Sequence, residues 1–153
     1  METLERIVAA HPFFAGLEKP HLKLITGCAS NVRFESGRFI CHTGDKAENF
    51  YLIREGKVAL ELHAPGRGTI SILTLEAGEI LGWSWLVPPY RWKFDARTVE
   101  PTRALALDGK CLRKKAEADH DLGYELFKRF TQVMEERLDA TRLQLMNVYE
   151  VHA

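Results

Sequence analysis

The sequence has little cysteine and no excess charge of either sign. It carries three cysteines in 153 residues, Cys28, Cys41 and Cys111, and no two of them form a CxxC pair. An odd number of widely separated cysteines indicates neither a disulfide framework nor a cysteine-rich metal site, so we expect reduced, packed thiols. Lys plus Arg and Asp plus Glu each number 21. This balance disfavours a dedicated nucleic-acid-binding domain, which needs basic surface against phosphates.

Long apolar runs are missing as well. No run approaches the roughly 20 residues that cross a bilayer, and charges stand among the apolar positions of the N-terminal stretch METLERIVAAHPFF, unlike the centre of a signal peptide. We therefore expect a soluble, cytoplasmic protein without membrane contact. With 46% hydrophobic residues the chain can bury a proper core, and we expect one domain over residues 1–153.

Motifs for catalysis and metal binding are also absent. The sequence contains no nucleophile elbow, Walker-type loop or paired-carboxylate motif. Six histidines are present, but only His42 and His63 fall in the β-rich region, and no HxH pair occurs. We expect no enzyme, no metal site and no cofactor.

The spacing of apolar residues changes twice along the sequence and divides it into three parts. Residues 1–30 show a helical period with a break at Pro12, which predicts two short helices. Residues 31–108 consist of short stretches of Val, Ile, Leu, Phe and Tyr separated by glycine turns. This pattern predicts the antiparallel strands of a sandwich or jelly roll.

The clearest strand pattern occupies residues 57–63, where apolar and polar residues alternate. We expect Val58, Leu60 and Leu62 to face the core, because alternate side chains of a strand point to the same side. Glu61 belongs to the opposite face, which we expect to be exposed to solvent.

Residues 109–153 return to a helical pattern. Asp108 stands where it would cap a short helix that ends near Asp119. From Leu122 to about Val148 there is no proline, and apolar residues recur at three- and four-residue steps. This part therefore predicts a short helix followed by a long one.

The long helix carries an apolar seam that predicts a dimer. Its members alternate in steps of four and three residues, as in a coiled coil. The seam consists of Phe127, Thr131, Met134, Leu138, Thr141, Leu145 and Val148. A second apolar stripe, Leu126, Phe130 and Val133, is available for packing on the strands. Because two stripes need two surfaces, we expect a homodimer through the seam.

The order of turns and strands resembles a known family on the runs FESGRFICHTGDKAENFYLIREGKVALEL and ISILTLEAGEILGWSWL. They are similar to the cyclic nucleotide-binding domain of the catabolite activator protein superfamily. The resemblance also covers the HPFF motif, the long final helix, and the glycines Gly37, Gly44, Gly56, Gly78 and Gly82. It implies a mainly β fold with flanking α-helices: a double-stranded β-helix (jelly roll) with two N-terminal helices and a long C-terminal dimerisation helix. It further implies a regulatory domain that signals through its C-terminal helices.

In this family, the segment that corresponds here to residues 82–98, which we call the cassette, binds the cyclic phosphate and the ribose. In the family, an acidic residue directly after the Gly82-like glycine accepts a hydrogen bond from the ribose hydroxyl. Trp83 stands at this position, and its indole can donate a hydrogen bond but cannot accept one. The phosphate-pairing arginine would fall on Lys93, or on the next residue after one insertion, with Arg91 and Arg97 as nearby cations. We therefore expect cAMP and cGMP to bind weakly or not at all.

The cassette is rich in aromatic residues, and two interpretations stay open. In the first, Trp83 or Trp85 stacks on a flat ligand, while Ser84 and the backbone near Gly82 bind an anionic or polar group. The candidate ligand-binding residues are then Gly82, Trp83, Ser84, Trp85, Arg91, Lys93, Arg97 and Thr98. In the second, the aromatic side chains fill the pocket, and the domain is a ligand-free module that docks on a partner protein.

Regulators that the sequence resembles usually continue beyond the long helix into a helix-turn-helix domain. This sequence stops at Ala153, with no room for a recognition helix. We therefore expect no direct DNA binding. The expected partners are a second copy of the chain and either a small molecule or another protein.

Overall fold

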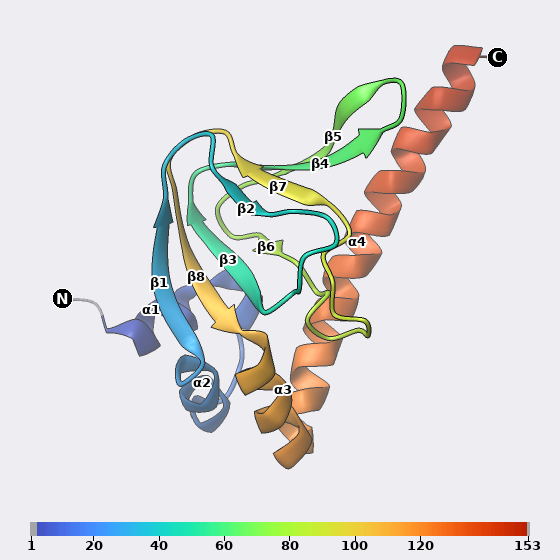
Figure 1. Ribbon diagram of the computed structural model, residues 1–153. Coiled ribbons are helices and arrows are strands. Elements are labelled where there is room, and N and C mark those ends of the chain that lie inside the picture. The colour runs from blue at the N-terminus through green and yellow to red at the C-terminus, as the bar shows by residue number, and fades with distance from the viewer. Residues whose placement is uncertain (1–2, 153) are drawn as a thin grey trace.

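Two antiparallel sheets form the centre of the computed structural model, which describes residues 3–152 and the side chains of residues 3–150 (Figure 1). The strands are β1 (Ala29–Phe34), β2 (Phe39–Cys41), β3 (Asn49–Glu55), β4 (Val58–Ala64), β5 (Gly68–Leu75), β6 (Ile80–Leu81), β7 (Asp95–Thr98) and β8 (Thr102–Asp108). One sheet has the order β1-β8-β3-β6 and the other β2-β7-β4-β5. This arrangement confirms the predicted antiparallel jelly roll.

Helices flank the sheets at both ends of the chain. They are α1 (Leu4–Ala10), the 3-10 helix η1 (Pro12–Phe14), α2 (Lys19–Thr26), α3 (Gly109–Ala118) and α4 (His120–His152). The Asp108 side chain accepts a hydrogen bond from the backbone N–H of Cys111 at 3.0 Å, which confirms the predicted cap of α3. The break at Pro12 is the 3-10 helix between α1 and α2.

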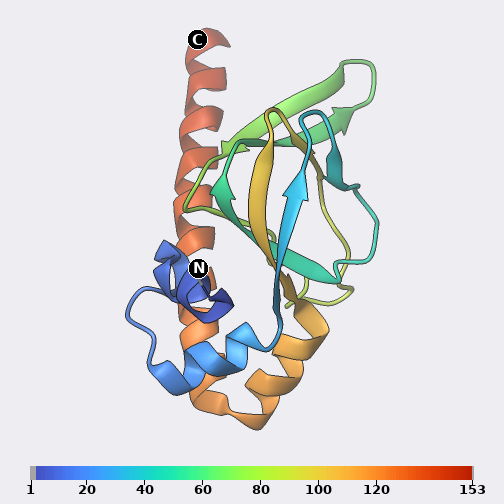
Figure 2. The same cartoon turned by 90° about the vertical axis from the view of Figure 1, so that its left-hand side faces the viewer.

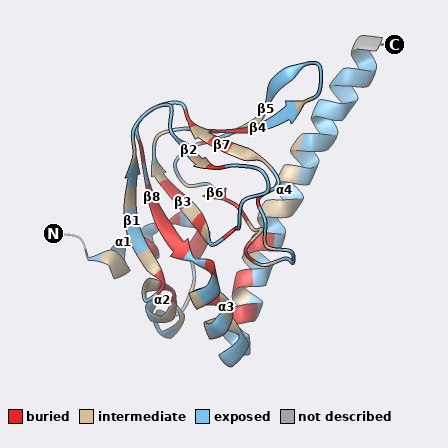
Figure 3. Ribbon diagram, in the orientation of Figure 1, coloured by how far each residue is buried: buried red, intermediate tan, exposed pale blue. Residues whose placement is uncertain are grey.

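The helix α4 runs along one side of the sheets and extends past them (Figures 1 and 2). Its first half packs on the domain through Leu126 and Phe130, which are at most 1% exposed, and through the partly buried Val133. The apolar stripe predicted to pack against the strands is thus confirmed. The second half of α4 is largely exposed (Figure 3). None of the described helices combines the length and the apolar character that a membrane span needs.

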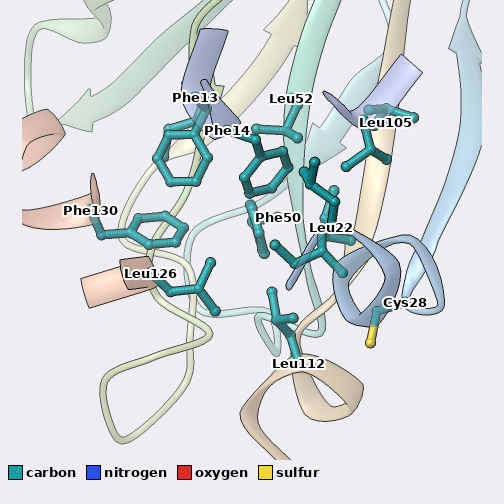
Figure 4. Packing of buried hydrophobic residues seen from close by; sticks show 14 of the residues in the cluster. Phe13, Phe14, Leu22, Cys28, Phe50, Leu52, Leu105, Leu112, Leu126 and Phe130 are labelled. Atoms are coloured by element: carbon teal, nitrogen blue, oxygen red, sulfur yellow. The ribbon is translucent and has the colours of Figure 1, made fainter. Parts of the chain in front are cut away.

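Buried apolar side chains form two clusters. The first, which we call the helical core, lies between the helices and the sheet that contains β3 (Figure 4). Its centre is the Phe50 ring, which stacks on Trp85 with centroids 4.8 Å apart and meets the edge of Phe130 at 5.2 Å. The second, the barrel core, lies between the two sheets and consists of Cys41, Ala47, Ile53, Val58, Leu60, Leu75, Leu81, Trp92 and Ala96.

Strand β4 differs from its predicted pattern. Leu62 is 41% exposed and Glu61 only 7%, so the prediction was wrong for both residues. β4 itself stays in regular register with β7, and the register shift beside Glu61 puts the extra residue in β5. Leu62 is therefore exposed because no described element covers this end of β4, and Glu61 is buried by its partner on β7. The buried Glu61 carboxylate accepts two hydrogen bonds from the Arg97 guanidinium, at 3.0 and 3.1 Å. This bidentate pair offsets the cost of removing the carboxylate from water.

Two of the three cysteines form a disulfide. Cys28 and Cys111 are bonded with their Cα atoms 5.8 Å apart, although 83 residues separate them in sequence. The prediction of reduced thiols was wrong for this pair, because spacing along the chain does not reveal that β1 pairs with β8 and brings the two segments together. Cys41 is free and buried, as predicted. Burial raises the pKa of its thiol to about 12.

Candidate functional site

The cassette is anchored to both cores through its tryptophans. Trp85 is fully buried in the helical core, and Trp92 is buried in the barrel core. The Trp92 ring lies directly against Gly82, where an added Cβ would be only 2.5 Å from the indole. Gly82 also has a φ of 95°, which side chains disfavour. Glycine is therefore required at this position by both the backbone and the packing of Trp92.

The residues that flank these two anchors form one wall of a pocket of about 330 Å³, which we call the cassette pocket. The β4–β5 hairpin and α4 form the other walls, and the Gln144 side-chain amide joins them by donating to the Ile72 carbonyl at 3.0 Å. The lining residues are Leu60, Leu62, Ile72, Leu73, Trp83, Ser84, Lys93, Phe94, Arg137, Ala140, Thr141 and Gln144. A ligand here would contact the hairpin, the cassette and the long helix at once.

The charges around the cassette pocket all have one sign. Lys93 and Arg137 are its two ionised lining residues, and no described carboxylate lines it. Most of the remaining wall is aliphatic or aromatic. Such a wall suits a ligand with an apolar body and a negative group. Elsewhere in the described part of the chain, no group of three or more His, Cys, Asp or Glu residues could hold a metal ion.

Arg137 has an unusual environment for an arginine. Its guanidinium donates a hydrogen bond to the Ile80 carbonyl, and its Cζ lies 5.1 Å from the centroid of the Trp83 ring. The ion pairs among the described residues do not include it. Burial lowers the pKa of this group to about 10, although the negative charges of Glu79 and Glu136 act in the opposite direction.

Three of the residues predicted to bind a ligand meet in the cassette pocket. They are Trp83, Ser84 and Lys93. Trp83 is partly exposed and presents its ring to the guanidinium of Arg137. Gly82 and Trp85 lie outside the lining: Gly82 packs on Trp92, and the Trp85 ring is in the helical core.

The other three predicted residues are engaged in structural contacts. The Arg91 guanidinium donates to the Gly44 carbonyl at 2.8 Å. Arg97 pairs with Glu61, as described above. The buried Thr98 hydroxyl donates to the Glu35 carbonyl at 2.6 Å and accepts from the backbone N–H of Arg38. None of the three lines the cassette pocket in the described part of the structure.

The sequence analysis missed Arg137, although a signal for it exists. The core-facing stripe of α4 continues in the same steps of four and three through Arg137, Ala140 and Gln144, all of which line the pocket. A charged residue inside the continuation of an apolar, buried stripe is a candidate for binding. The predicted dimer seam lies beside this stripe and shares the pocket at one residue, Thr141.

The cassette is also connected to α3. The Arg113 guanidinium donates to the Trp85 carbonyl and stacks over the Tyr90 ring, with its Cζ 4.4 Å from the centroid. Arg113 therefore joins two points of the cassette to the helix that precedes α4.

A jelly roll whose cassette and long helix enclose a small pocket has the architecture of a ligand-binding regulatory domain. The family model described as "Cyclic nucleotide-binding domain" matches residues 31–119. The chain belongs to the cyclic nucleotide-binding domain family, as the resemblance to the catabolite activator protein superfamily implied. No curated protein matches it significantly.

Solved structures agree with this family. A protein of Geobacter metallireducens GS-15 named for cyclic nucleotide binding is 30% identical, with a TM-score of 0.78 over 90% of this chain and 99% of its own. A cyclic nucleotide-binding domain from Methylobacillus flagellatus KT has 16% identity and a TM-score of 0.79, covering 94% of this chain and 79% of its own. The catabolite activator protein of Thermus thermophilus has 24% identity and a TM-score of 0.71, covering 90% and 63% respectively. The last two share the fold.

Proposed function

We propose that residues 1–153 act as one regulatory domain, which binds a small anionic or aromatic ligand in the cassette pocket and signals through its C-terminal helices. The observation that carries the proposal is the pocket wall, in which Lys93 of the cassette and Arg137 of α4 line one cavity that lacks a described carboxylate. A ligand that contacts both elements favours the arrangement of α4 in which both contacts are made. Domains of this family are typically regulatory, so we propose no catalytic activity.

Cyclic nucleotides are weak ligands in this proposal. A related fold, a kinase regulatory subunit mutant from Trypanosoma brucei, was solved with cAMP bound. In the present chain, Trp83 follows Gly82, at the position where a carboxylate would accept a hydrogen bond from the ribose hydroxyl. Neither Arg91 nor Arg97 lines the pocket. Loss of one charge-assisted hydrogen bond costs about 1.5–3 kcal/mol. Loss of two would raise the Kd by at least about 100-fold.

The seam of α4 supports a homodimer. Phe127, Leu138 and Leu145 are each more than half exposed, so the chain's own barrel does not cover them. The two threonines of the seam satisfy their hydroxyls inside the helix, since Thr131 donates to the Phe127 carbonyl and Thr141 to that of Arg137. A partner helix could therefore cover the seam without leaving these hydroxyls unpaired. We infer pairing around a twofold axis.

The partners that we propose are the second protomer and the small-molecule ligand. The balanced charge of the chain supports the inference that it does not itself bind DNA. We place its action in the cytoplasm, as the sequence led us to expect. The Cys28–Cys111 disulfide would then lie in a compartment that contains thiol reductants, so its oxidation state should be measured in each binding experiment.

A second candidate function is a ligand-free module that docks on a partner protein. The packing of Trp85 and Trp92 favours it, because these rings fill the interior next to Gly82. The two functions differ in what the cassette pocket contains. In the module it would hold solvent only, and the exposed face of the cassette would contact protein.

Native mass spectrometry of the freshly purified protein distinguishes the two functions. We expect a retained small molecule, at up to one per protomer, that is released on denaturation. Titration calorimetry with cAMP and cGMP accompanies this measurement, and we expect little or no heat at micromolar concentrations. Sub-micromolar binding of cAMP would contradict the proposed ligand preference. A protein that retains nothing and binds none of the small molecules tried would favour the docking module.

A further inference from the structure

The positive charge of Arg137 is compensated on only one side. Arg137 lines two cavities, and one of them is also lined by Glu79, Glu136 and Arg129. The other, the cassette pocket, has no described carboxylate and adds a second cation, Lys93. Removing a charge from water without a partner costs free energy. Arg137 therefore has no negatively charged neighbour on the described wall of the cassette pocket.

The guanidinium also has unused hydrogen-bonding capacity. It offers five N–H donors in a planar fork, and the Ile80 carbonyl is its one acceptor among the described residues. Trp83 covers its face at 5.1 Å, which leaves the edge with the N–H groups free to donate. A carboxylate or phosphate monoanion matches such a fork, because two oxygens accept two parallel hydrogen bonds.

The rest of the wall sets the shape of the ligand. The hairpin contributes Leu60, Leu62 and Ile72, and the cassette contributes the rings of Trp83 and Phe94. Flat apolar groups gain most from such a surface. The arginines that the sequence offered for a phosphate, Arg91 and Arg97, are bonded to Gly44 and Glu61 outside the pocket.

From these contacts, and resting on the proposed function, we infer that Arg137 is the anion-binding residue of the cassette pocket. Its ligand is a flat aromatic monoanion, whose charged group lies between Arg137 and Lys93. Because one cation is on α4 and the other on the cassette, the bound anion links the two elements directly. A neutral ligand of the same shape would occupy the apolar part of the pocket without this link.

A matched pair of probes tests the inference: 2-naphthoate, which carries a carboxylate, and 2-naphthamide, its neutral counterpart. Titrations are followed by tryptophan fluorescence and calorimetry. We expect the wild type to bind the carboxylate at least about 10-fold more tightly than the amide, as a charge-assisted hydrogen bond provides. Arg137→Met should abolish this preference and change the affinity for the amide less than about 3-fold.

Two further variants make the test specific. Lys93→Met changes an exposed cassette residue, so it should fold normally and reduce the preference partly. Arg142→Met removes the same charge from an exposed position on α4, where Arg142 pairs with Asp139, and should leave the preference unchanged. If Arg142→Met and Arg137→Met lost the preference for the carboxylate equally, the preference would come from the overall positive charge near α4. That result would overturn the inference.

The outcomes also separate this inference from the proposed function. Equal binding of the two probes by the wild type, or a preference that survives both Arg137→Met and Lys93→Met, would overturn the role of Arg137 while leaving a ligand-binding domain. If neither probe binds, the inference fails; if the purified protein also retains no small molecule in native mass spectrometry, the proposed ligand-binding function fails with it. If Arg137→Met does not fold, as judged by its thermal transition, Lys93→Met decides the question: a preference for the carboxylate that this variant leaves unchanged would overturn the inference.

Discussion

Trp83 and Trp85 lie two residues apart in the cassette and both touch the helical core, but only Trp83 also lines the cassette pocket. Trp85 is fully buried in the helical core, stacked on Phe50. Trp83 is partly exposed on the wall of the cassette pocket, with a cation over its ring. The helical core is closed and aromatic, whereas the pocket is open and is lined by two cations and no described carboxylate. The comparison indicates that stability and ligand binding are assigned to neighbouring residues that can be altered separately.

The largest difference between the two regions is expected for their tryptophans. Trp85→Ala leaves a cavity in the helical core and should lower the free energy of unfolding by roughly 3–5 kcal/mol. Trp83→Ala should cost less than about 1 kcal/mol, because its side chain is partly exposed, while weakening ligand binding. Urea denaturation measures both.

Trp85→Phe is the control for Trp85→Ala. The Trp85 Nε1 has no described hydrogen-bond partner, so the ring stabilises the core by packing alone. Trp85→Phe should therefore lower the free energy of unfolding less than Trp85→Ala. A loss above about 3 kcal/mol for Trp83→Ala would mean that the pocket is filled and the comparison is invalid.

The disulfide next to the helical core should have the second largest effect. Cys28→Ser removes a cross-link that closes a long loop, and we expect a loss of about 2–4 kcal/mol. Wild-type protein treated with a dithiol reductant should melt at the same temperature as Cys28→Ser with Cys111→Ser. The melting temperature of that double variant should not respond to the reductant. A reductant-insensitive wild type would argue against the bond.

The dimer seam extends the comparison to the exposed half of α4. Leu138→Lys with Leu145→Lys places like charges against their symmetry mates, so the dimer Kd should rise by about 100-fold or more. Leu143→Lys, an equally exposed residue off the seam, should remain dimeric. Sedimentation equilibrium distinguishes these states. A monomeric wild type, or a dimeric double variant, would show that the seam was misinterpreted.

The smallest effect concerns His11, which is buried where η1 meets β3. Burial lowers its pKa, and its ring is neutral: Nε2 donates to the Ile53 carbonyl at 3.1 Å, while Nδ1 accepts from the backbone N–H of Phe13. Because the unfolded chain binds the proton more readily, stability should fall as the pH drops below the ordinary histidine pKa of 6.5. His11→Gln should flatten this dependence. The exposed His63, changed to Gln, should not.

Much of the fold follows from local signals in the sequence. Asp108 caps α3 because its short acidic side chain stands just before a helical period. The hydrogen bond that makes the cap joins residues only three positions apart, Asp108 and Cys111. The glycine turns and the core-facing stripe of Leu126 and Phe130 are equally local. By contrast, the pairing of Glu61 with Arg97 depends on the neighbouring strand β7, which is distant in sequence. The exposure of Leu62 likewise depends on which elements cover the end of β4.

The candidate site was only partly predictable for a similar reason. Trp83, Ser84 and Lys93 could be named because the cassette is one continuous segment with a recognisable start at Gly82. Arg137 comes from a helix far along the chain and reaches the pocket only through the packing of α4 on the domain. Which of the tryptophans line the pocket and which fill a core depends on the space left by residues from other elements.

The sequence by itself determined the helices, the antiparallel strands and the family, because these depend on periodicity, caps and turns whose interacting residues are neighbours along the chain. The tertiary structure alone decided the Cys28–Cys111 bond, the burial of Trp85 and the position of Arg137 beside Trp83. Each of these joins residues that are distant in sequence. Their contacts depend on how sheets and helices pack in three dimensions, which spacing along the chain does not encode.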